Sequence, residues 1–430
     1  MTERLYYADA FRTNFEAVVT DIQELSRADG KSIWGLALDR SAFYPSSGGQ
    51  PYDTGRLIAT APSGAELAAE IVNVEEDEAS GIVWHHTAKP LLAGTPVRGV
   101  VNQVRRFDHM QQHSGQHLLS AAFIQICGAP TVSFHLGNTT STIDLSADRL
   151  SEDVLRQVAE LANRIIAEDR PVHIQTISRG EAEAMFAAGE LRKLPSRAGD
   201  LRIVEIAGFD RNACGGTHVR STGQIGGLHL RSTEKVKQGI RVEFVCGLRA
   251  MTAAREDFLT LTKAARQLSV HLAETPEAIG RLLADAKAAS KQTQALTGEL
   301  LRYRAKELVR DTPVMGGMRC VQLQLLPPEV SDSGQAKLLA SKVVAEGEKT
   351  VALVSWRPRV DKAAPATLIL ARSRDLTFDC GAVLKEILTK FGGRGGGSPD
   401  LAQGSADGEH LEPVLEAIRR KSGVPAAPQT

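Results

Sequence analysis

The sequence predicts an α+β protein built from several domains. Patterns typical of strands and patterns typical of helices alternate in blocks along its 430 residues, a length that exceeds most single domains. With 42% hydrophobic and 24% charged residues, the composition is that of an ordinary globular protein. We therefore expect four successive regions, at residues 1–104, 105–247, 248–311 and 312–430.

Residues 1–104 are predicted to form a small, mostly β domain that resembles a barrel. Apolar or alternating runs are separated there by clusters of Gly, Pro, Ser and Asp, which favour turns. The runs are 15–22, 33–39, 65–76, 81–87 and 95–102. A Gly-Gly-Gln sequence at 48–50 is typical of a tight turn between the second and third runs.

Residues 105–247 mix long helices with short strands, and we expect an α+β domain there. The helical patterns cover 108–127 and 151–169. The strand-like runs are 141–145, 171–177, 201–206, 227–232 and 241–246.

The last two regions are predicted to be a helical arm and an α/β domain. Apolar residues lie at helical spacing as far as Leu268, and a second helix starts near Thr275, which can cap it, and Pro276, which suits a first turn. These helices should form a hairpin or a coiled-coil arm. Beyond residue 312, strand-like runs alternate with helical ones and lead to the glycine-rich run 392–397.

Charge and cysteine content narrow the classes of protein that need consideration. Basic and acidic residues both number 51, so any binding of nucleic acid would need local patches. The five cysteines are odd in number and far apart, which favours a reducing compartment over a disulfide framework. Neither a signal peptide nor an apolar run of about 18 residues is present. We therefore expect a cytoplasmic protein with no membrane partner.

Three histidines recur at intervals of four residues in the pattern 108–127. Asp108 is a suitable N-cap and Gln111 could complete a capping box, which predicts a helix beginning at His109. On that helix His113 and His117 project from one face, where two imidazoles can hold one metal ion. The same spacing also occurs in solvent-facing or hydrogen-bonded histidines.

A cysteine and a further histidine complete a candidate set of metal ligands. Ser114 stands where a zinc peptidase would need glutamate, which excludes that chemistry. Cys214 and His218 in "CGGTH" flank a flexible Gly-Gly turn, and with His113 and His117 they suit tetrahedral zinc better than magnesium or calcium. His109 is either a fifth ligand or a residue that only supports the helix turn.

Several motifs, in order, resemble one known family. They are "FYPSSGGQPYDTG" at 43–55, "HSGQHLL" at 113–119, "SFHLG" at 133–137, "STIDL" at 141–145, "CGGTH" at 214–218 and "GIRVEFVCG" at 239–247. The chain resembles the alanyl-tRNA editing proteins, free-standing relatives of the editing half of alanyl-tRNA synthetase. Its "GGRGGGSPDLAQGS" at 392–405 resembles the C-terminal domain that the synthetase shares with DHH-type phosphoesterases.

The resemblance implies a hydrolase that removes serine and glycine from mischarged tRNA(Ala), with zinc as its cofactor. Since no aminoacylation domain precedes residue 1, the expected editing is in trans. The implied zinc ligands are His113, His117, Cys214 and His218. The candidate substrate contacts are Gly48, Gly49, Gln50, Gln116 and His135. The candidate tRNA contacts are Lys390, Gly392, Gly393, Arg394, Gly395, Gly396 and Gly397, although Ser398 replaces an expected basic residue.

Each of these residues also has a simpler interpretation. The Gly-Gly-Gln sequence could be only a turn, Gln116 an exposed amide, His135 a core residue and 392–397 a flexible loop. Zinc could activate water or anchor the substrate, and no general base stands out in the sequence.

Two other functions compete with the hydrolase. The first is a non-catalytic tRNA-binding module with structural zinc. The second is a DHH-type phosphoesterase, for which the sequence lacks the aspartate-rich metal motifs. The C-terminal domain could in addition support a homodimer.

Overall fold

The protein has the α+β architecture that its sequence predicts. The computed structural model describes residues 1–28, 31–192, 194–195, 199–361 and 364–424. The chain divides into two units, residues 1–264 and 265–430. The predicted division into four regions is finer than this and stays a prediction. Among the described residues, every helix is too short or too polar to cross a lipid bilayer.

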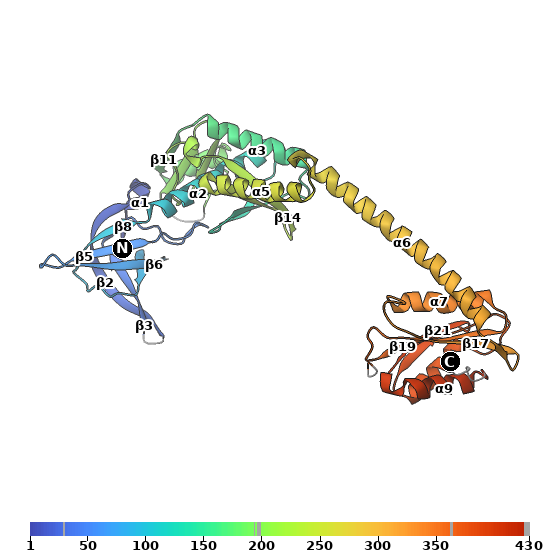
Figure 1. Ribbon diagram of the computed structural model, residues 1–430. Helices are drawn as coiled ribbons and strands as arrows, with labels where there is room; N and C mark the ends of the chain where they lie inside the picture. Colours follow the sequence, from blue (N-terminus) through green and yellow to red (C-terminus); the bar gives the residue numbers. More distant parts are fainter. Residues whose placement is uncertain (29–30, 193, 196–198, 362–363, 425–430) are drawn as a thin grey trace. The chain divides into compact units, whose positions relative to one another are not determined.

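The first unit begins with a closed β-barrel, in which neighbouring strands are antiparallel (Figure 1). In barrel order its strands are β2 (Asn14–Ala28), β3 (Lys31–Leu38), β7 (Ile82–Thr87), β6 (Glu66–Asp77), β5 (Gly55–Thr60) and β8 (Pro96–Val101). All five predicted runs form strands. Strand β5 is not among the predicted runs; it pairs with both β6 and β8 and is needed to close the barrel.

Short elements flank the barrel at its amino-terminal end. Strand β1 (Glu3–Arg4) pairs in parallel with β4 (Arg40–Ser41), and α1 (Leu5–Ala8) follows β1 directly. Tyr6 of α1 packs its ring against Tyr44, just beyond β4, at a centroid distance of 5.2 Å. The chain entering the barrel is therefore tied to the segment that leads into the Gly-Gly-Gln turn.

Helix α2 (Gln103–Cys127) follows β8 after a single residue. The predicted start at His109 is wrong, because Asn102 already caps the helix by accepting a hydrogen bond from Arg105 N at 3.1 Å. Asp108 lies within the helix instead, and its Oδ1 accepts a bond from Arg249 Nε at 2.7 Å. The histidines therefore occupy the middle of a helix of 25 residues, away from its frayed ends.

α2 runs through the core of the first unit. Every residue from His109 to Phe123 is buried, polar ones included. Its apolar residues share one hydrophobic cluster with α3 (Glu152–Ala167) and with a sheet of order β14-β15-β10-β9. The strands of that sheet are β9 (Thr131–Leu136), β10 (Ser141–Leu145), β14 (Leu228–Val236) and β15 (Gly239–Cys246).

A second, three-stranded sheet leads into the "CGGTH" loop. Its order is β11 (Val172–Ile177), β12 (Leu201–Ile206) and β13 (Asp210–Ala213), with α4 (Arg179–Ala187) between the first two in sequence. Strand β13 ends at Ala213, so Cys214 is fixed by the last residue of a paired strand. Beyond the loop, the short helix η1 (Thr222–Ile225) precedes β14.

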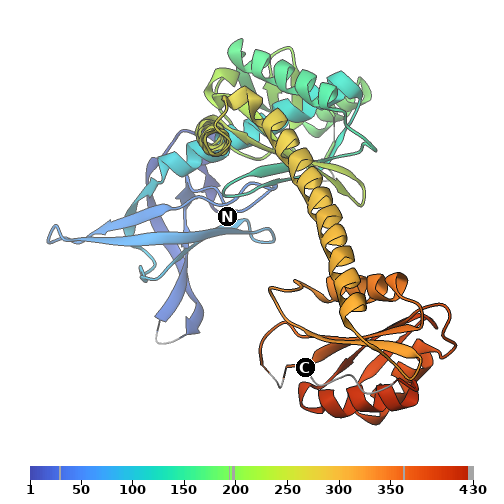
Figure 2. The same ribbon diagram turned by 45° about the vertical axis from the view of Figure 1, so that its right-hand side comes forward.

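The helical region contains α5 (Gly247–Gln267), the short η2 (Leu272–Glu274) and α6 (Thr275–Asp311). Pro276 lies in the first turn of α6 as predicted, although Glu274 rather than Thr275 is the capping residue. Figure 2 shows α6 as one unbroken helix, and it contains 37 residues. Near its end, Leu301 and Ala305 are buried in the core of the second unit.

The second unit is a six-stranded mixed sheet covered on both faces. Its order is β16 (Val314–Met315), β17 (Met318–Leu325), β18 (Thr350–Trp356), β19 (Ala366–Arg372), β21 (Leu401–Ala406) and β20 (Arg394–Gly397). Along β18 alternate residues enter two separate clusters: Val351 packs with α8 (Cys380–Lys390) and α9 (Leu411–Lys421), and Ala352 with α7 (Ser333–Glu346). A short helix, η3 (Gly408–His410), precedes α9.

A buried ion pair fastens α2 to the barrel. Arg106 donates from Nε to Asp53 Oδ2 at 2.9 Å, and from its two terminal nitrogens to the carbonyls of Ala10 at 2.6 Å and Ala42 at 2.5 Å. The side chains of Arg106 and Asp53 are 2% and 0% exposed. The histidine helix is thereby held to the loop that contains the Gly-Gly-Gln turn.

We expect Arg106→Met to lower the free energy of unfolding of the first unit by about 3–5 kcal/mol, because it leaves the buried Asp53 carboxylate without a cation. Denaturation followed by the fluorescence of Trp34 and Trp84 in the barrel measures this change. The matched control is Arg98→Met, since the side chain of Arg98 is 51% exposed and its removal should cost less than about 1 kcal/mol. Equal effects of the two substitutions would contradict the anchoring role of Arg106.

Candidate metal centre

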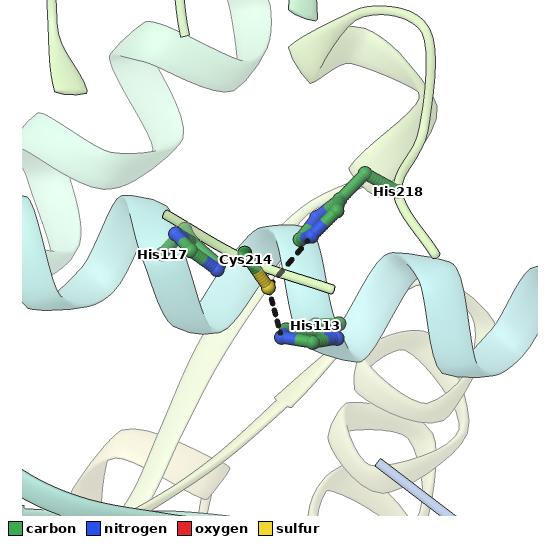
Figure 3. Close-up of side chains that lie close together, drawn as sticks. All are labelled: His113, His117, Cys214 and His218. Atoms are coloured by element: carbon green, nitrogen blue, oxygen red, sulfur yellow. Dashed lines mark hydrogen bonds between the residues drawn. The ribbon is translucent and has the colours of Figure 1, made fainter. Parts of the chain in front are cut away.

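Four side chains from two distant parts of the chain converge on one point (Figure 3). The donor atoms of His113, His117, Cys214 and His218 all lie within 4.8 Å of one another. The Sγ atom of Cys214 is 3.4 Å from Nε2 of His113 and 3.3 Å from Nε2 of His218. Three imidazole nitrogens and one sulfur therefore form a group that could hold a metal ion.

Helix geometry and loop contacts explain this convergence. His113 and His117 are one turn apart on α2, and their ring centroids are 5.3 Å apart. Arg202 on β12 holds the opposing loop by donating to the carbonyls of Cys214 and Gly216, both at 2.9 Å. A Cβ atom on Gly216 would lie 2.2 Å from Cε1 of His113, so glycine at this position allows the loop to approach the helix.

Each imidazole has a polar neighbour on its Nδ1 side. Nδ1 of His113 lies 2.9 Å from Oε1 of Gln50, and Nδ1 of His218 lies 3.2 Å from Oγ of Ser114. Nδ1 of His117 is 3.6 Å from Oδ2 of Asp210, which is longer than a hydrogen bond. These neighbours orient the rings so that the Nε2 atoms of His113 and His218 face Cys214.

The surroundings favour a thiolate in the cluster. Burial alone raises the pKa of the Cys214 thiol, but the imidazoles of His113, His218 and His117 outweigh it and hold that pKa well below its ordinary value. Burial disfavours a charge on His117, yet Cys214 and Asp210 raise its pKa to about 9. Burial lowers the pKa of His218 to about 3. The thiolate is the form of cysteine that binds metal ions.

His109 lies outside this group. It is 1% exposed, and neither of its ring nitrogens has a hydrogen-bond partner among the described residues. Burial, with the positive charge of Arg105 second, lowers its pKa to about 3. The structure thus places His109 as a neutral residue of the core, next along the helix face from His113, and not among the four clustered donors.

His135 is exposed on β9 and does not join the cluster. Its neighbour Phe134 does approach, with its ring centroid 5.7 Å from that of His113. Adjacent residues in a strand point to opposite faces, so only one of the two can face the centre. His135 is therefore not the core residue considered for it, and its predicted contact with the substrate stays a prediction.

Gln50 and Gln116 are both buried, so the exposed amide considered for Gln116 is wrong. Oε1 of Gln50 also accepts from Thr217 N at 3.0 Å, and its Nε2 donates to Thr217 Oγ1 at 2.8 Å. Nε2 of Gln116 donates to Ser120 Oγ at 2.9 Å, while its Oε1 has no partner within the described part of the chain. Gly48 is exposed at the tip of the turn.

Several residues that support the centre are not among those predicted from the sequence. Ser114, Thr217 and Asp210 contact a histidine of the cluster or the loop that bears it. Ser114 and Thr217 lie inside the two ligand motifs, so their position was a usable signal. No sequence signal indicated Asp210, because its position near His117 depends on how strand β13 pairs.

The predicted tRNA contacts lie in the second unit. Arg394, Gly395, Gly396 and Gly397 form strand β20 at an edge of the sheet, so a flexible loop is wrong for this part of the run. A Cβ on Gly395 would lie 2.5 Å from Cδ1 of Leu388, which explains the lack of a side chain there. Gly392, with φ +73°, and Gly393 join α8 to β20. Lys390 pairs with Glu386 at 3.0 Å.

Comparison with known proteins connects this arrangement to tRNA synthetases. Residues 201–242, which include the "CGGTH" loop, match the family described as the threonyl and alanyl tRNA synthetase second additional domain. The alanine–tRNA ligase of Natronomonas pharaonis is 33% identical over 422 residues, which cover 97% of this chain and 43% of the ligase. That of Methanoculleus marisnigri is 31% identical over 427 residues, covering 98% and 43%.

The chain spans less than half the length of these ligases. The C-Ala domain of Aquifex aeolicus alanyl-tRNA synthetase aligns with 25% of the chain at 18% identity, and its TM-score of 0.21 is too low to inform on the fold. The agreement in sequence, by contrast, covers both units and confirms the resemblance that the motifs indicate. The chain is thus similar over nearly its whole length to part of the alanine–tRNA ligases, and its residues 201–242 match the second additional domain of threonyl and alanyl tRNA synthetases.

Proposed function

We propose that this protein is an aminoacyl-tRNA deacylase that removes serine and glycine from mischarged tRNA(Ala). The observation that carries the proposal is the meeting of His113, His117, Cys214 and His218 in a chain related over 97% of its length to alanine–tRNA ligases. We place the activity in the cytoplasm, where thiols such as the five free cysteines stay reduced.

The chemistry and spacing of the donors support zinc as the cofactor. Bonds of about 2.3 Å to sulfur and about 2.0–2.1 Å to nitrogen at a tetrahedral angle place two such donors about 3.5 Å apart. The sulfur–nitrogen separations of 3.3 and 3.4 Å around Cys214 are close to that value. When bound, zinc would supply a Lewis acid for the ester carbonyl or acidify a water molecule.

The residues around the centre would bind and orient the aminoacyl end. A pocket that activates alanine rejects an added hydroxyl by only about a hundredfold, so a second site must recognise serine by hydrogen bonding. Gln116 is suited to this, because its buried Oε1 lacks a partner among the described residues and could accept from the serine hydroxyl. With alanine that oxygen would stay unpaired, which disfavours binding.

A tRNA substrate also requires contacts far from its acylated end. We propose that strand β20 supplies some of them, since it is an edge strand paired on one side only, and glycines allow the backbone N–H groups of its free edge to approach phosphates closely. Arg394 is exposed beside these glycines. With equal numbers of acidic and basic residues in the whole chain, local contacts of this kind must account for the affinity.

A non-catalytic module with structural zinc is the alternative that one observation favours. All four donors come from the protein, and closed sites of four protein ligands are typical of structural zinc. The two functions differ in what happens when one ligand is removed, because a structural ion contributes directly to folding.

Incubation with seryl-, glycyl- and alanyl-tRNA(Ala) tests the proposed activity. We expect the seryl and glycyl esters to be hydrolysed, and the alanyl ester to be spared relative to the seryl ester by at least about a hundredfold, because the methyl group of alanine satisfies no buried acceptor. Glycine has no hydroxyl either, so the hydrolysis of its ester does not depend on that acceptor. A chelator should abolish the hydrolysis, and added Zn²⁺ should restore it. Equal rates on the three esters would contradict a proofreading role, and no hydrolysis would favour the binding module.

Substitution of Cys214 separates catalysis from structural support. We expect Cys214→Ala to reduce deacylation by at least about a hundredfold while the circular dichroism spectrum and melting temperature change little, since the loop is held by Arg202 as well. Cys127→Ala is the control, because Cys127 is an exposed thiol at the end of α2, the helix that bears His113 and His117. Unfolding of Cys214→Ala with Cys127→Ala intact would instead support structural zinc.

The salt dependence of tRNA binding tests the role of β20. We expect Arg394→Ala to lower the slope of log affinity against log salt by about 1, as for the loss of one phosphate contact. Lys342→Ala removes one positive charge from α7, which packs on the face of the sheet opposite α8, and should leave the slope unchanged. Filter binding at several salt concentrations measures both, and an equal change in the two variants would rule out a specific contact at β20.

A further inference from the structure

The Gly-Gly-Gln turn reaches the metal centre from the barrel, and the side chain of its glutamine is bonded to the histidine helix and to the loop that bears Cys214. Gln50 is 2% exposed. Its Oε1 faces both His113 Nδ1 and the backbone N–H of Thr217, and its Nε2 donates to Thr217 Oγ1. A side chain that recognises a substrate needs a polar atom to offer it; here the carbonyl oxygen faces two protein donors, and one of the two amide N–H groups is bonded to Thr217.

These contacts fix the protonation pattern of His113. A backbone N–H can only donate, so the atom of Gln50 that faces Thr217 N must be its oxygen. The same oxygen lies 2.9 Å from His113 Nδ1, which must therefore carry the proton. In the neutral ring, Nε2 of His113, 3.4 Å from Cys214 Sγ, then has its lone pair directed at the centre.

The glycines before Gln50 serve the placement of that side chain. Ser47 and Gln50 close the turn through reciprocal backbone hydrogen bonds of 3.1 and 2.9 Å. Gly48 and Gly49 have φ angles of +54° and +81°, which favour glycine. A Cβ on Gly49 would lie 2.6 Å from the ring of Phe134, which itself packs on His113. The Gly49 carbonyl also accepts from Leu136 N at 3.2 Å, so the turn is bonded to β9.

We propose that Gln50 is a positioning residue for the metal centre and does not contact the substrate. It holds His113 in the tautomer whose Nε2 can bind a metal ion, and through Thr217 it joins this ring to the loop that bears Cys214 and His218. The barrel is thereby a structural part of the centre. This role rests on the proposed zinc site, but it does not depend on which ester, if any, the protein hydrolyses.

The affinity for Zn²⁺, measured by competition with a chromophoric chelator, tests this role. Loss of a residue that supports a metal-binding histidine typically weakens binding by about 10–100-fold, and we expect this of Gln50→Leu. Gln50→Glu keeps an acceptor for His113 Nδ1 and should restore most of the affinity. Thr217→Val removes one bond to Gln50 and should weaken binding by less. Ser47→Ala, in the same turn, is the control and should bind as the wild type does.

Two further readouts distinguish positioning from substrate contact. In spectra of protein labelled with ¹⁵N-histidine, the Nδ1–H signal of His113 should be present in the wild type and lost or shifted in Gln50→Leu. In deacylation assays of the zinc-saturated protein, the preference for seryl- over alanyl-tRNA(Ala) should be the same in both. If Gln50→Leu fails to fold, Gln50→Glu and Thr217→Val carry the same measurements.

Wild-type zinc affinity in Gln50→Leu and Thr217→Val, or a lost preference for the seryl ester at full zinc occupancy, would overturn the proposal. Failure of the wild type to bind Zn²⁺ would overturn it together with the zinc site. Absence of deacylation with the expected order of zinc affinities would overturn only the proposed enzymatic function.

Discussion

The metal centre depends on a helix that buries many polar residues, several of which bond to other segments of the chain. A buried polar side chain without a hydrogen bond costs free energy, so α2 can cross the core only if other segments bring donors and acceptors to it. Gln50 arrives from the barrel and the Cys214–His218 loop from β13. Gln112 bonds both backbone groups of Cys246 at the end of β15, at 2.8 and 3.0 Å. The contacts that stabilise the helix therefore also assemble the site.

Three glycines allow this close assembly. A Cβ on Gly49 would collide with the ring of Phe134, and one on Gly216 would collide with the ring of His113. A Cβ on Gly115 would lie 2.2 Å from Cys246 Sγ. Glycine within a helix costs about 1 kcal/mol relative to alanine, so its presence in the middle of α2 requires a compensating contact. The approach of β15 to the helix provides one. The spacing of the histidines and the glycine between them are thus parts of one packing solution.

Local pattern predicted the α+β class, five of the six barrel strands and the four donors, since these depend on alternation and on residue chemistry. The predictions were incomplete where contacts between residues that are distant in the sequence determine the structure. Arg249 binds Asp108 across 141 positions, which releases that aspartate from a capping role. Position in a pleated strand, rather than residue type, selects Phe134 over His135. The bond between Gln50 and His113 joins positions 63 apart, and no spacing rule would indicate it.

The two halves of the donor set are supplied about a hundred residues apart, from α2 and from the loop after β13. In the unfolded chain, bringing such distant segments together is opposed by chain entropy, so an ion would be held there by at most one half. In the folded chain the two halves already lie together, so the entropic cost of bringing them together does not oppose the binding of an ion. Binding of an ion at this site is thus expected to come late in maturation. The framework of barrel, helix and sheet should fold first, with little contribution from the ion.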